Sequence, residues 1–419
     1  MAGVARSAGG LRCCAGFGPF WAAATVSSFG TYVTTLAVQV LVVLTLGGGA
    51  AEVGLVSAAR WLPYLMFGVP AGVFVDRVRR RPILVTTDFV RCVLLVAIPT
   101  LAVVHHLSLV VLVAFMFVFG LASLANDAAS QSFLPRIVPP RLLTRANARL
   151  DQSDAVAQTS GPALAGGLVS LLTAPWAVLV DAASYFASGL LLLRVPVAEP
   201  PSRRFSLRGV RGEAVEGLRW IYRHQTLGPY VLSTHGWFLV NGVAGATLPL
   251  FALRTIGLSP FGLGLALAAA GAGGLLGALS ATGLGARFGA GHIVIASTVG
   301  NGMAWALIAS AWHGWGGWVV FGVGEFLLGL TMGTANANEM GYMQSITPDH
   351  LQGRTNATRR SINRAMIVIG APLGGVLADA VGYRPMLYAA AVGFGLVSAS
   401  LAISPYRHAR IDDPARAIG

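Results

Sequence analysis

The sequence contains no lysine and little charge of any kind. Its 419 residues are only 11% charged, whereas soluble domains carry about 25%. A soluble chain of this length would split into two or three cores covered by charged surfaces, and too few charges are present to cover them. With 55% hydrophobic residues and a mean hydropathy of +0.69, the composition excludes a soluble enzyme and a disordered chain. The expected solvent is the lipid bilayer.

Cysteine is also scarce, with only Cys13, Cys14 and Cys92. Adjacent thiols do not easily bridge each other, and no metal-binding spacing exists, so we expect neither a structural disulfide nor a metal site. The sequence has no Walker-type GxxxxGK[ST] loop and no recognisable Ser-His-Asp constellation. We therefore expect neither an enzyme, nor a bound cofactor, nor ATP as a direct energy source.

Twelve apolar runs are long enough to cross a bilayer as helices, because a spanning helix needs about 20 apolar residues. They predict an all-α membrane protein with spans at roughly 20–45, 52–75, 83–104, 107–128, 150–172, 175–194, 227–251, 260–283, 291–311, 316–337, 361–381 and 384–404. The longer link at 195–226 contains a stripe of apolar residues at helical spacing. It predicts an amphipathic helix on the inner membrane surface.

The arginines alternate between the two sides of these spans. If the N-terminus is inside, 25 of the 29 fall on the inner side, and only Arg254 and Arg384 fall outside; Arg60 and Arg91 lie within spans. This asymmetry predicts cytoplasmic termini. A net charge of +13 could instead suggest nucleic acid, but the arginines lie between apolar runs and not on one face of a domain, so we expect no such partner.

The chain repeats itself at two offsets. A shift of 209 residues brings eight positions into register, placing Gly161 on Gly370 and Gly166 on Gly375. A shift of 303 places Gly72, Asp76 and Arg81 on Gly375, Asp379 and Arg384, with the first stretch inside and the second outside. Two six-helix bundles, each built of inverted three-helix units, are typical of one transporter class. We predict domains at 1–194 and 227–419, joined by the 195–226 linker.

The stretch from Gly72 to Pro82 carries a resemblance to a known family. It is similar to the G-x-x-x-D-R-x-G-R-R motif of the major facilitator superfamily, with Arg79 in place of the second glycine. The closest likeness is to the subgroup of the enterobactin exporter, macrolide efflux proteins and related multidrug pumps. This resemblance implies a gate at the inner end of the second span, formed by Gly72, Asp76, Arg77, Arg80 and Arg81.

The fifth span resembles the antiporter motif of the same family. Gly161 and Pro162 are followed by Gly166 and Gly167, one residue further on than in the family pattern. Small residues allow close helix packing, and we assign this role to Gly161, Pro162, Gly166, Gly167, Gly370 and Gly375. The alternative, ordinary glycine-rich packing with no link to antiport, stays open.

Charged side chains inside the bilayer need a reason, because each costs about 2.5–3.5 kcal/mol on insertion scales. Glu325 lies deep in the tenth span, which suits a carboxylate that takes up and releases a proton or holds a cationic substrate; a structural pair with a buried arginine is the alternative. Asp76 and Asp127 are further candidates for proton coupling, although Asp127 also suits a gate salt bridge with the Arg136–Arg149 cluster. Asp88 and Arg91 share a helix face and are expected to neutralise each other.

Polar residues within spans are the candidates for lining a substrate cavity. We expect this role for Arg60, Gln39, His235, Asn241, Asn301 and Glu325. Arg60 has no acid nearby in sequence, so it reaches Asp88 or Glu325 across the bundle or contacts an anionic substrate. Asp181 and Asp379 lie toward the outer side, where they can cap helices or close an outer gate.

These features predict a proton-coupled exporter of small amphipathic molecules, acting as a monomer in a bacterial inner membrane. The alternatives are a proton-linked importer and a transport-inactive receptor or scaffold. Substrate identity stays open among siderophores, macrolides, tetracycline-like drugs and a natural product, because Arg60 suggests anions and Glu325 suggests cations.

Overall fold

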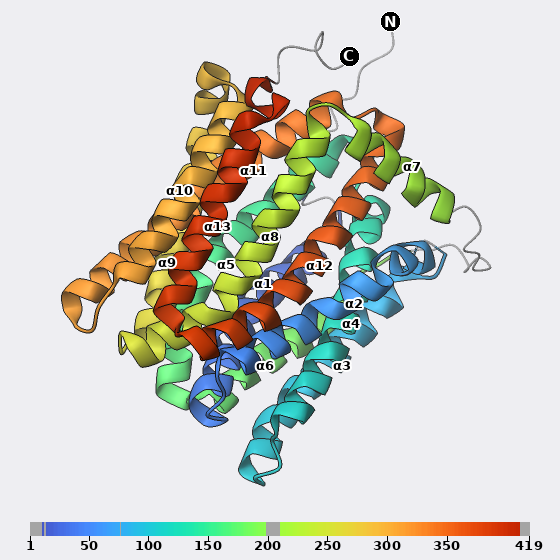
Figure 1. Cartoon of the computed structure of the whole chain (residues 1–419). Helices are drawn as coiled ribbons and strands as arrows, with labels where there is room; N and C mark the ends of the chain where they lie inside the picture. The colour runs from blue at the N-terminus through green and yellow to red at the C-terminus, as the bar shows by residue number, and fades with distance from the viewer. Residues whose placement is uncertain (1–10, 12–13, 76, 198–209, 411–419) are drawn as a thin grey trace, which may run out of the picture.

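A computed structural model describes residues 11, 14–75, 77–197 and 210–410. Within these ranges every regular element is helical, and long helices run side by side through the molecule (Figure 1). The helices are α1 (Phe17–Val40), α2 (Ala50–Val75), α3 (Arg80–Val103), α4 (Leu109–Ile137), α5 (Leu143–Leu172), α6 (Ala174–Leu193), α7 (Val210–Arg223), α8 (Leu227–Leu250), α9 (Pro260–Phe288), α10 (Ala290–Ser310), α11 (Trp315–Ile346), α12 (Asp349–Val381) and α13 (Tyr383–Ile403).

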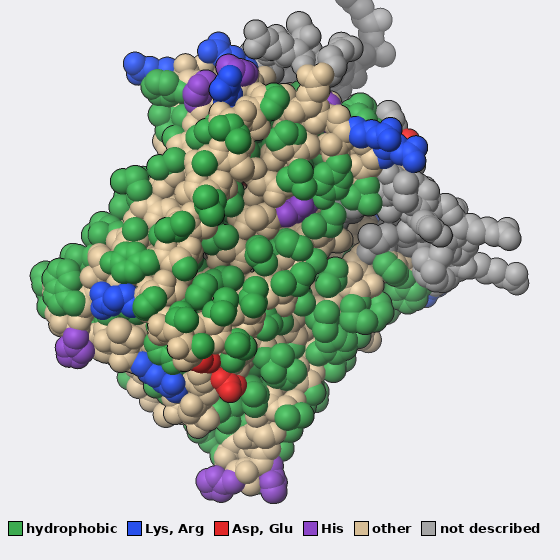
Figure 2. Space-filling view, in the orientation of Figure 1, with side chains coloured by type: hydrophobic (Ala, Val, Ile, Leu, Met, Phe, Trp, Pro, Cys, Tyr) green, Lys and Arg blue, Asp and Glu red, His purple; other side chains and the backbone are tan. Residues whose placement is uncertain are grey.

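Eleven of the described helical segments are long and apolar enough to cross a membrane. The 26-residue α2 packs beside them against α4 and α12. Figure 2 shows hydrophobic side chains over most of the visible face, with most charged side chains near its upper and lower ends. The structure thus confirms an all-helical membrane protein, since only lipid makes such an apolar exterior stable.

Three helices extend nine residues or more beyond the apolar runs that predicted them. The predicted span 107–128 becomes α4, which continues to Ile137, and 316–337 becomes α11, which continues to Ile346. The predicted span 361–381 begins twelve residues earlier, at Asp349. Hydropathy detects only the apolar part of a helix, and these three carry polar residues at the end where α1 begins.

The two sets of six helices pack by the same scheme. In the first set α1 lies against α5 and α6, α3 against α4 and α6, and α2 against α4. In the second set α8 lies against α12 and α13, α10 against α11 and α13, and α9 against α11. The sets meet mainly through α2 with α12 and α5 with α9, which are equivalent pairs. The domain boundaries at 194 and 227 stay a prediction.

The hydrophobic cores differ between the two ends of the bundle. We call the end where α1 begins and α13 finishes the terminal end, and the end where α1 passes into α2 the far end. One core cluster at the far end joins both sets, from Leu36 and Phe119 to Phe251 and Phe394. At the terminal end the cores are separate, one around Phe133 and one in the second set. The sets are therefore closed against each other at the far end.

The linker contains α7, whose described part contacts α8 and α12 (Figure 1). The Tyr222 hydroxyl and one ring nitrogen of His235 lie 2.6 Å apart, and the other ring nitrogen lies 2.7 Å from the Asn363 side-chain oxygen. Residues 198–209 of the predicted linker lie outside the described residues. The helix predicted here exists, and the contact of Tyr222 with His235 joins it to the second set.

Candidate functional site

A large cavity of about 940 Å³ lies between the two sets of helices. Its wall comes from α1 and α5 of the first set and from α8, α9, α10 and α11 of the second. Three predicted cavity residues, Gln39, Asn241 and Glu325, line it together with Pro162. Apart from these polar groups and Asp151 the wall is mostly apolar and glycine-rich, which suits amphipathic molecules.

Glu325 is the most unusual residue of this wall. It is only 2% exposed, and its Oε1 has no hydrogen-bond partner among the described residues. The Nε1 of Trp305, on the same wall, is also buried without a partner. A buried charged carboxylate without a partner costs several kcal/mol, so this position favours a side chain that is neutral while the cavity is in this state.

A smaller chamber of about 210 Å³ adjoins the cavity inside the second set. The two share Asn241, Met332 and Asn336 as lining residues. The predicted cavity residue Asn301 lines this chamber and accepts a hydrogen bond of 2.7 Å from Thr331. Glu339 also lines it, and the sequence analysis did not single out that residue.

Two predicted cavity residues line neither space. Arg60 donates a hydrogen bond of 2.9 Å to Thr35 Oγ1, and its guanidinium lies over the Phe119 ring, so it reaches neither Asp88 nor Glu325. Both ring nitrogens of His235 are occupied by Tyr222 and Asn363. Sequence gives no rotation of a helix about its own axis, and both side chains face neighbouring helices.

The expected salt bridge of Asp127 with the Arg136–Arg149 cluster does not form. The exposed Asp127 instead accepts a hydrogen bond of 2.7 Å from the Tyr64 hydroxyl of α2. Beside this pair, Arg364 of α12 lies over the Trp61 ring of α2, at 3.8 Å from the ring centroid. The arginine pattern predicts Arg364 on the inner side, but Arg364 stacks within the bundle and joins the two sets.

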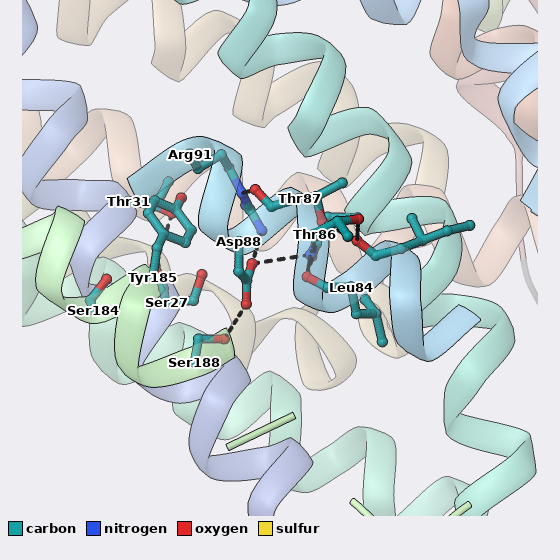
Figure 3. A network of polar contacts seen from close by, with 12 residues as sticks. Ser27, Thr31, Leu84, Thr86, Thr87, Asp88, Arg91, Ser184, Tyr185 and Ser188 are labelled. Carbon is teal, nitrogen blue, oxygen red and sulfur yellow. Dashed lines mark hydrogen bonds and ion pairs between the residues drawn. The ribbon is translucent and has the colours of Figure 1, made fainter. Parts of the chain in front are cut away.

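Asp88 and Arg91 form a buried ion pair in the first set, as predicted (Figure 3). Ser188 donates to Asp88 at 2.6 Å, Asn126 donates at 3.2 Å, and the Arg91 guanidinium lies 4.2 Å from the Tyr185 ring centroid. The pair lines neither described cavity. It ties α3 to α4 and α6, so its role is structural.

The predicted gate is only partly described. Asp76 lies outside the described residues, and of Gly72 the structure gives only its place in α2. Arg77 and Arg80 lie at the terminal end, where Arg80 is buried. Arg81 donates to the carbonyl groups of Leu192 and Leu193, where α6 ends, with 3.1 Å to the Leu192 oxygen. Positive side chains there complement the negative end of the helix dipole.

The inverted counterpart of this segment is fully described at the far end. Asp379 of α12 accepts hydrogen bonds from the backbone nitrogens of Ala50, at 2.9 Å, and Ala51, at 2.8 Å. It thereby caps the first turn of α2 in the other set, as the sequence suggested. Arg384 donates to the carbonyls of Ala309 and Ala311 at the end of α10, as Arg81 does at the end of α6.

A second far-end contact joins the sets. Arg254, which follows α8, donates hydrogen bonds of 3.0 Å to the carbonyls of Val43 and Gly48, which follow α1. We call the contacts of Asp379 and Arg254 across the two sets the far-end lock. Neither residue forms an ion pair among the described residues. Asp379 binds backbone nitrogens of the first turn of α2, which have no partner within that helix, and Arg254 binds carbonyls of the segment between α1 and α2.

The predicted packing glycines form two equivalent pairs. A Cβ on Gly161 would meet Tyr32 of α1, and one on Gly370 would meet the Leu239 carbonyl of α8, both within one set. A Cβ on Gly166 would lie 2.6 Å from the Pro260 carbonyl of α9, and one on Gly375 would meet the Ala50 carbonyl of α2, both between sets. Gly167 is different, since a Cβ added there would lie 3.9 Å from its nearest neighbour, the Phe261 ring.

A family model described as transmembrane secretion effector matches residues 13–415. The multidrug efflux pump Tap of Mycolicibacterium fortuitum is 27% identical over 378 residues, which are 86% of this chain and 88% of Tap. Macrolide efflux protein A of Streptococcus pyogenes is 23% identical over 372 residues, 87% of this chain and 90% of that protein.

Two further comparisons show a relative that matches over part of its length and a solved structure with a similar fold. The uncharacterised MFS-type transporter y4rN of Sinorhizobium fredii is 27% identical over 266 residues, 62% of this chain and 63% of the relative, so the match spans less than two thirds of that relative. A crystal structure of a mutant nucleoside transporter NupG superimposes with a TM-score of 0.73 at 12% identity, over 92% of this chain and 98% of that one. The second likeness concerns the fold alone.

Proposed function

Because the chain belongs to the transmembrane secretion effector family of the major facilitator superfamily, we propose that this secondary transporter exports small amphipathic molecules in exchange for protons. The observation that supports the proposal most is Glu325, a buried carboxylate on the wall of a cavity between two sets of helices, whose Oε1 has no hydrogen-bond partner in the part of the chain that the structure describes. Such a group can carry a proton from one side to the other when the sets tilt and change the side to which the cavity opens.

We place the terminal end on the cytoplasmic side of a bacterial inner membrane, because the arginine-rich segments lie at that end. The far end is closed by the far-end lock and by the shared core. The cavity then loads from the cytoplasm in this state. Release follows when the far end opens and the terminal end closes through the segment around Asp76, which repeats the Asp379 segment on the opposite side of the membrane.

The proton gradient supplies enough energy for this cycle. One charge that moves inward across 100 mV releases about 2.3 kcal/mol, or roughly a fiftyfold concentration ratio. Two of the curated relatives are named as drug efflux proteins, so drug-like molecules are our proposed substrate class. Siderophores have no support among these relatives.

The test is transport by the full chain in proteoliposomes with an imposed pH gradient and a panel of macrolides and lipophilic drugs. We expect gradient-driven movement that a protonophore abolishes and that Glu325→Gln reduces at least about a hundredfold, as loss of the coupling group requires. Glu52→Gln is the control, since Glu52 bonds only Gly49 at the far end. Drug movement in the same direction as the protons would identify a proton-linked importer. No movement of any drug in the panel would favour a receptor or scaffold.

A further inference from the structure

The smaller chamber has a composition of its own. It lies inside the second set, between α8, α10, α11 and α13, and its lining residues include Tyr230, Trp237, Phe238, Thr298 and Glu339. Through Asn241, Met332 and Asn336 it adjoins the central cavity. The two spaces are therefore neighbours, separated or joined only by these three side chains.

Glu339 is the one charged residue among those that line the chamber. Its Oε2 accepts a hydrogen bond of 2.7 Å from the Tyr230 hydroxyl, which orients the carboxylate. Trp237 and Phe238 add two aromatic rings with centroids 5.0 Å apart. A carboxylate beside aromatic rings is the chemistry that binds organic ammonium groups, because ring faces and carboxylate both attract positive charge.

Arg359 is the nearest competing cation, and it lies outside the chamber lining. Its Nη1 is 3.5 Å from the Tyr230 hydroxyl and its Nη2 is 3.4 Å from Asn356 Oδ1. Among the described residues no ion pair joins Arg359 to Glu339. The charge of Arg359 acts on the Glu339 carboxylate, but no direct bond to Arg359 occupies it.

The two glutamates of α11 are too far apart to act on one small ligand together. Glu325 and Glu339 are fourteen residues apart, about 21 Å along a helix that rises 1.5 Å per residue. Positions 325, 329, 332, 336 and 339 recur at three and four residues, so both carboxylates follow the cavity-facing side of the helix. One can carry the proton while the other holds the substrate.

We propose that this chamber binds the cationic head group of the exported molecule, an aromatic or alkyl ammonium ion. The ammonium lies against Glu339, and the attached ring packs against Trp237 and Phe238, which line the same chamber. This inference rests on the proposed function, and it assigns Glu339 to the substrate and Glu325 to the proton. It favours amine-containing drugs over acidic ones, because an anion would meet the Glu339 carboxylate.

The test measures binding of benzyltrimethylammonium to the purified full chain in lipid nanodiscs by calorimetry. Its neutral isostere, neopentylbenzene, is measured by competition as the matched ligand. We expect Glu339→Gln to weaken binding of the cation about tenfold or more, the loss of one charged contact, and to leave the isostere unchanged. Glu52→Gln, a carboxylate variant at the far end that lines neither the chamber nor the cavity, leaves the cation affinity within about twofold.

Cation binding that is unchanged in Glu339→Gln, or that is weakened equally in Glu52→Gln, would overturn the proposal. If Glu339→Gln lowers the melting temperature of the protein, Trp237→Leu serves as the second variant, and the proposal requires it to weaken the cation more than the isostere. Transport assays separate the two levels. Binding that depends on Glu339 without proton-driven movement refutes the proposed function and leaves the chamber assignment standing.

Discussion

Removing the carboxylate of Asp379 should open the far end. Asp379 accepts two hydrogen bonds from the first turn of α2 in the other set, at 2.9 and 2.8 Å. Hydrogen bonds to charged groups contribute about 1.5–3 kcal/mol each when buried, but Asp379 is exposed. Asp379→Asn keeps one acceptor and loses the charge, so we take about 1.5 kcal/mol as the loss, a tenfold shift between the closed and open far end.

The assay is the distance distribution between spin labels at Val104 and Trp312, in a background without Cys13, Cys14 and Cys92. Both labelled positions are exposed at the far end and belong to different sets, at 49% and 53% of full exposure. We expect Asp379→Asn to populate a longer distance that is rare in the wild type. Glu52→Gln removes a carboxylate from the same turn without touching the other set, and it should leave the distribution unchanged.

An unchanged distribution in Asp379→Asn would refute the reasoning. So would an equal shift in Glu52→Gln, because the effect would then come from the end of α2 itself and not from the contact between sets.

Three further variants test other contacts. Gly166→Ala should destabilise the protein by about 1–3 kcal/mol in thermal unfolding, because its Cβ would overlap the Pro260 carbonyl, whereas Gly167→Ala should be neutral; equal effects would contradict the assigned interface. Arg364→Lys keeps the charge and loses the planar stack on Trp61, at a cost of about 1 kcal/mol. It should raise the population of the longer distance between the same two labels about fivefold, and wild-type distances would show that the stack does not hold the two sets together. Tyr222→Phe should speed hydrogen exchange in the second half of α7 about fivefold, since one hydrogen bond contributes about 1 kcal/mol, and unchanged exchange would show that the contact does not hold the helix.

Much of the fold could be predicted because hydropathy and the 209-residue repeat are properties of the chain itself. The repeat placed Gly161 with Gly370 and Gly166 with Gly375, and the structure gives each pair equivalent neighbours. The inverted repeat likewise identified Asp379 and Arg384, which bind backbone groups at helix ends. These residues share a task because their segments share a local geometry.

The site itself was only half predictable. Gln39, Asn241 and Glu325 were chosen as polar residues within spans, and they line the cavity. Arg60 and His235 were chosen by the same criterion, and they bond neighbouring helices instead. The difference is the rotation of each helix, which depends on contacts distant in sequence and leaves no periodic signal in such uniformly apolar segments.

Glu339 and Arg364 were missed for a second reason. Hydropathy ended the tenth span at 337 and assigned Arg364 to the inner surface, because charge lowers the apolar average near a helix end. Both residues lie inside the bundle, where Tyr230 and Trp61 contact them. The sequence did contain a signal for both residues. Each is a charged residue within two turns of the end of a predicted span, and aromatic residues in other spans could contact it.

The most direct test of the central claim is transport of an amine-containing drug in proteoliposomes as the pH gradient is reversed. The account predicts that the drug moves against the proton flow in both gradient directions. It also predicts that Glu325→Gln abolishes this reversal and leaves exchange of labelled for unlabelled drug intact. Drug movement that ignores the sign of the gradient, or full reversal in Glu325→Gln, would contradict it.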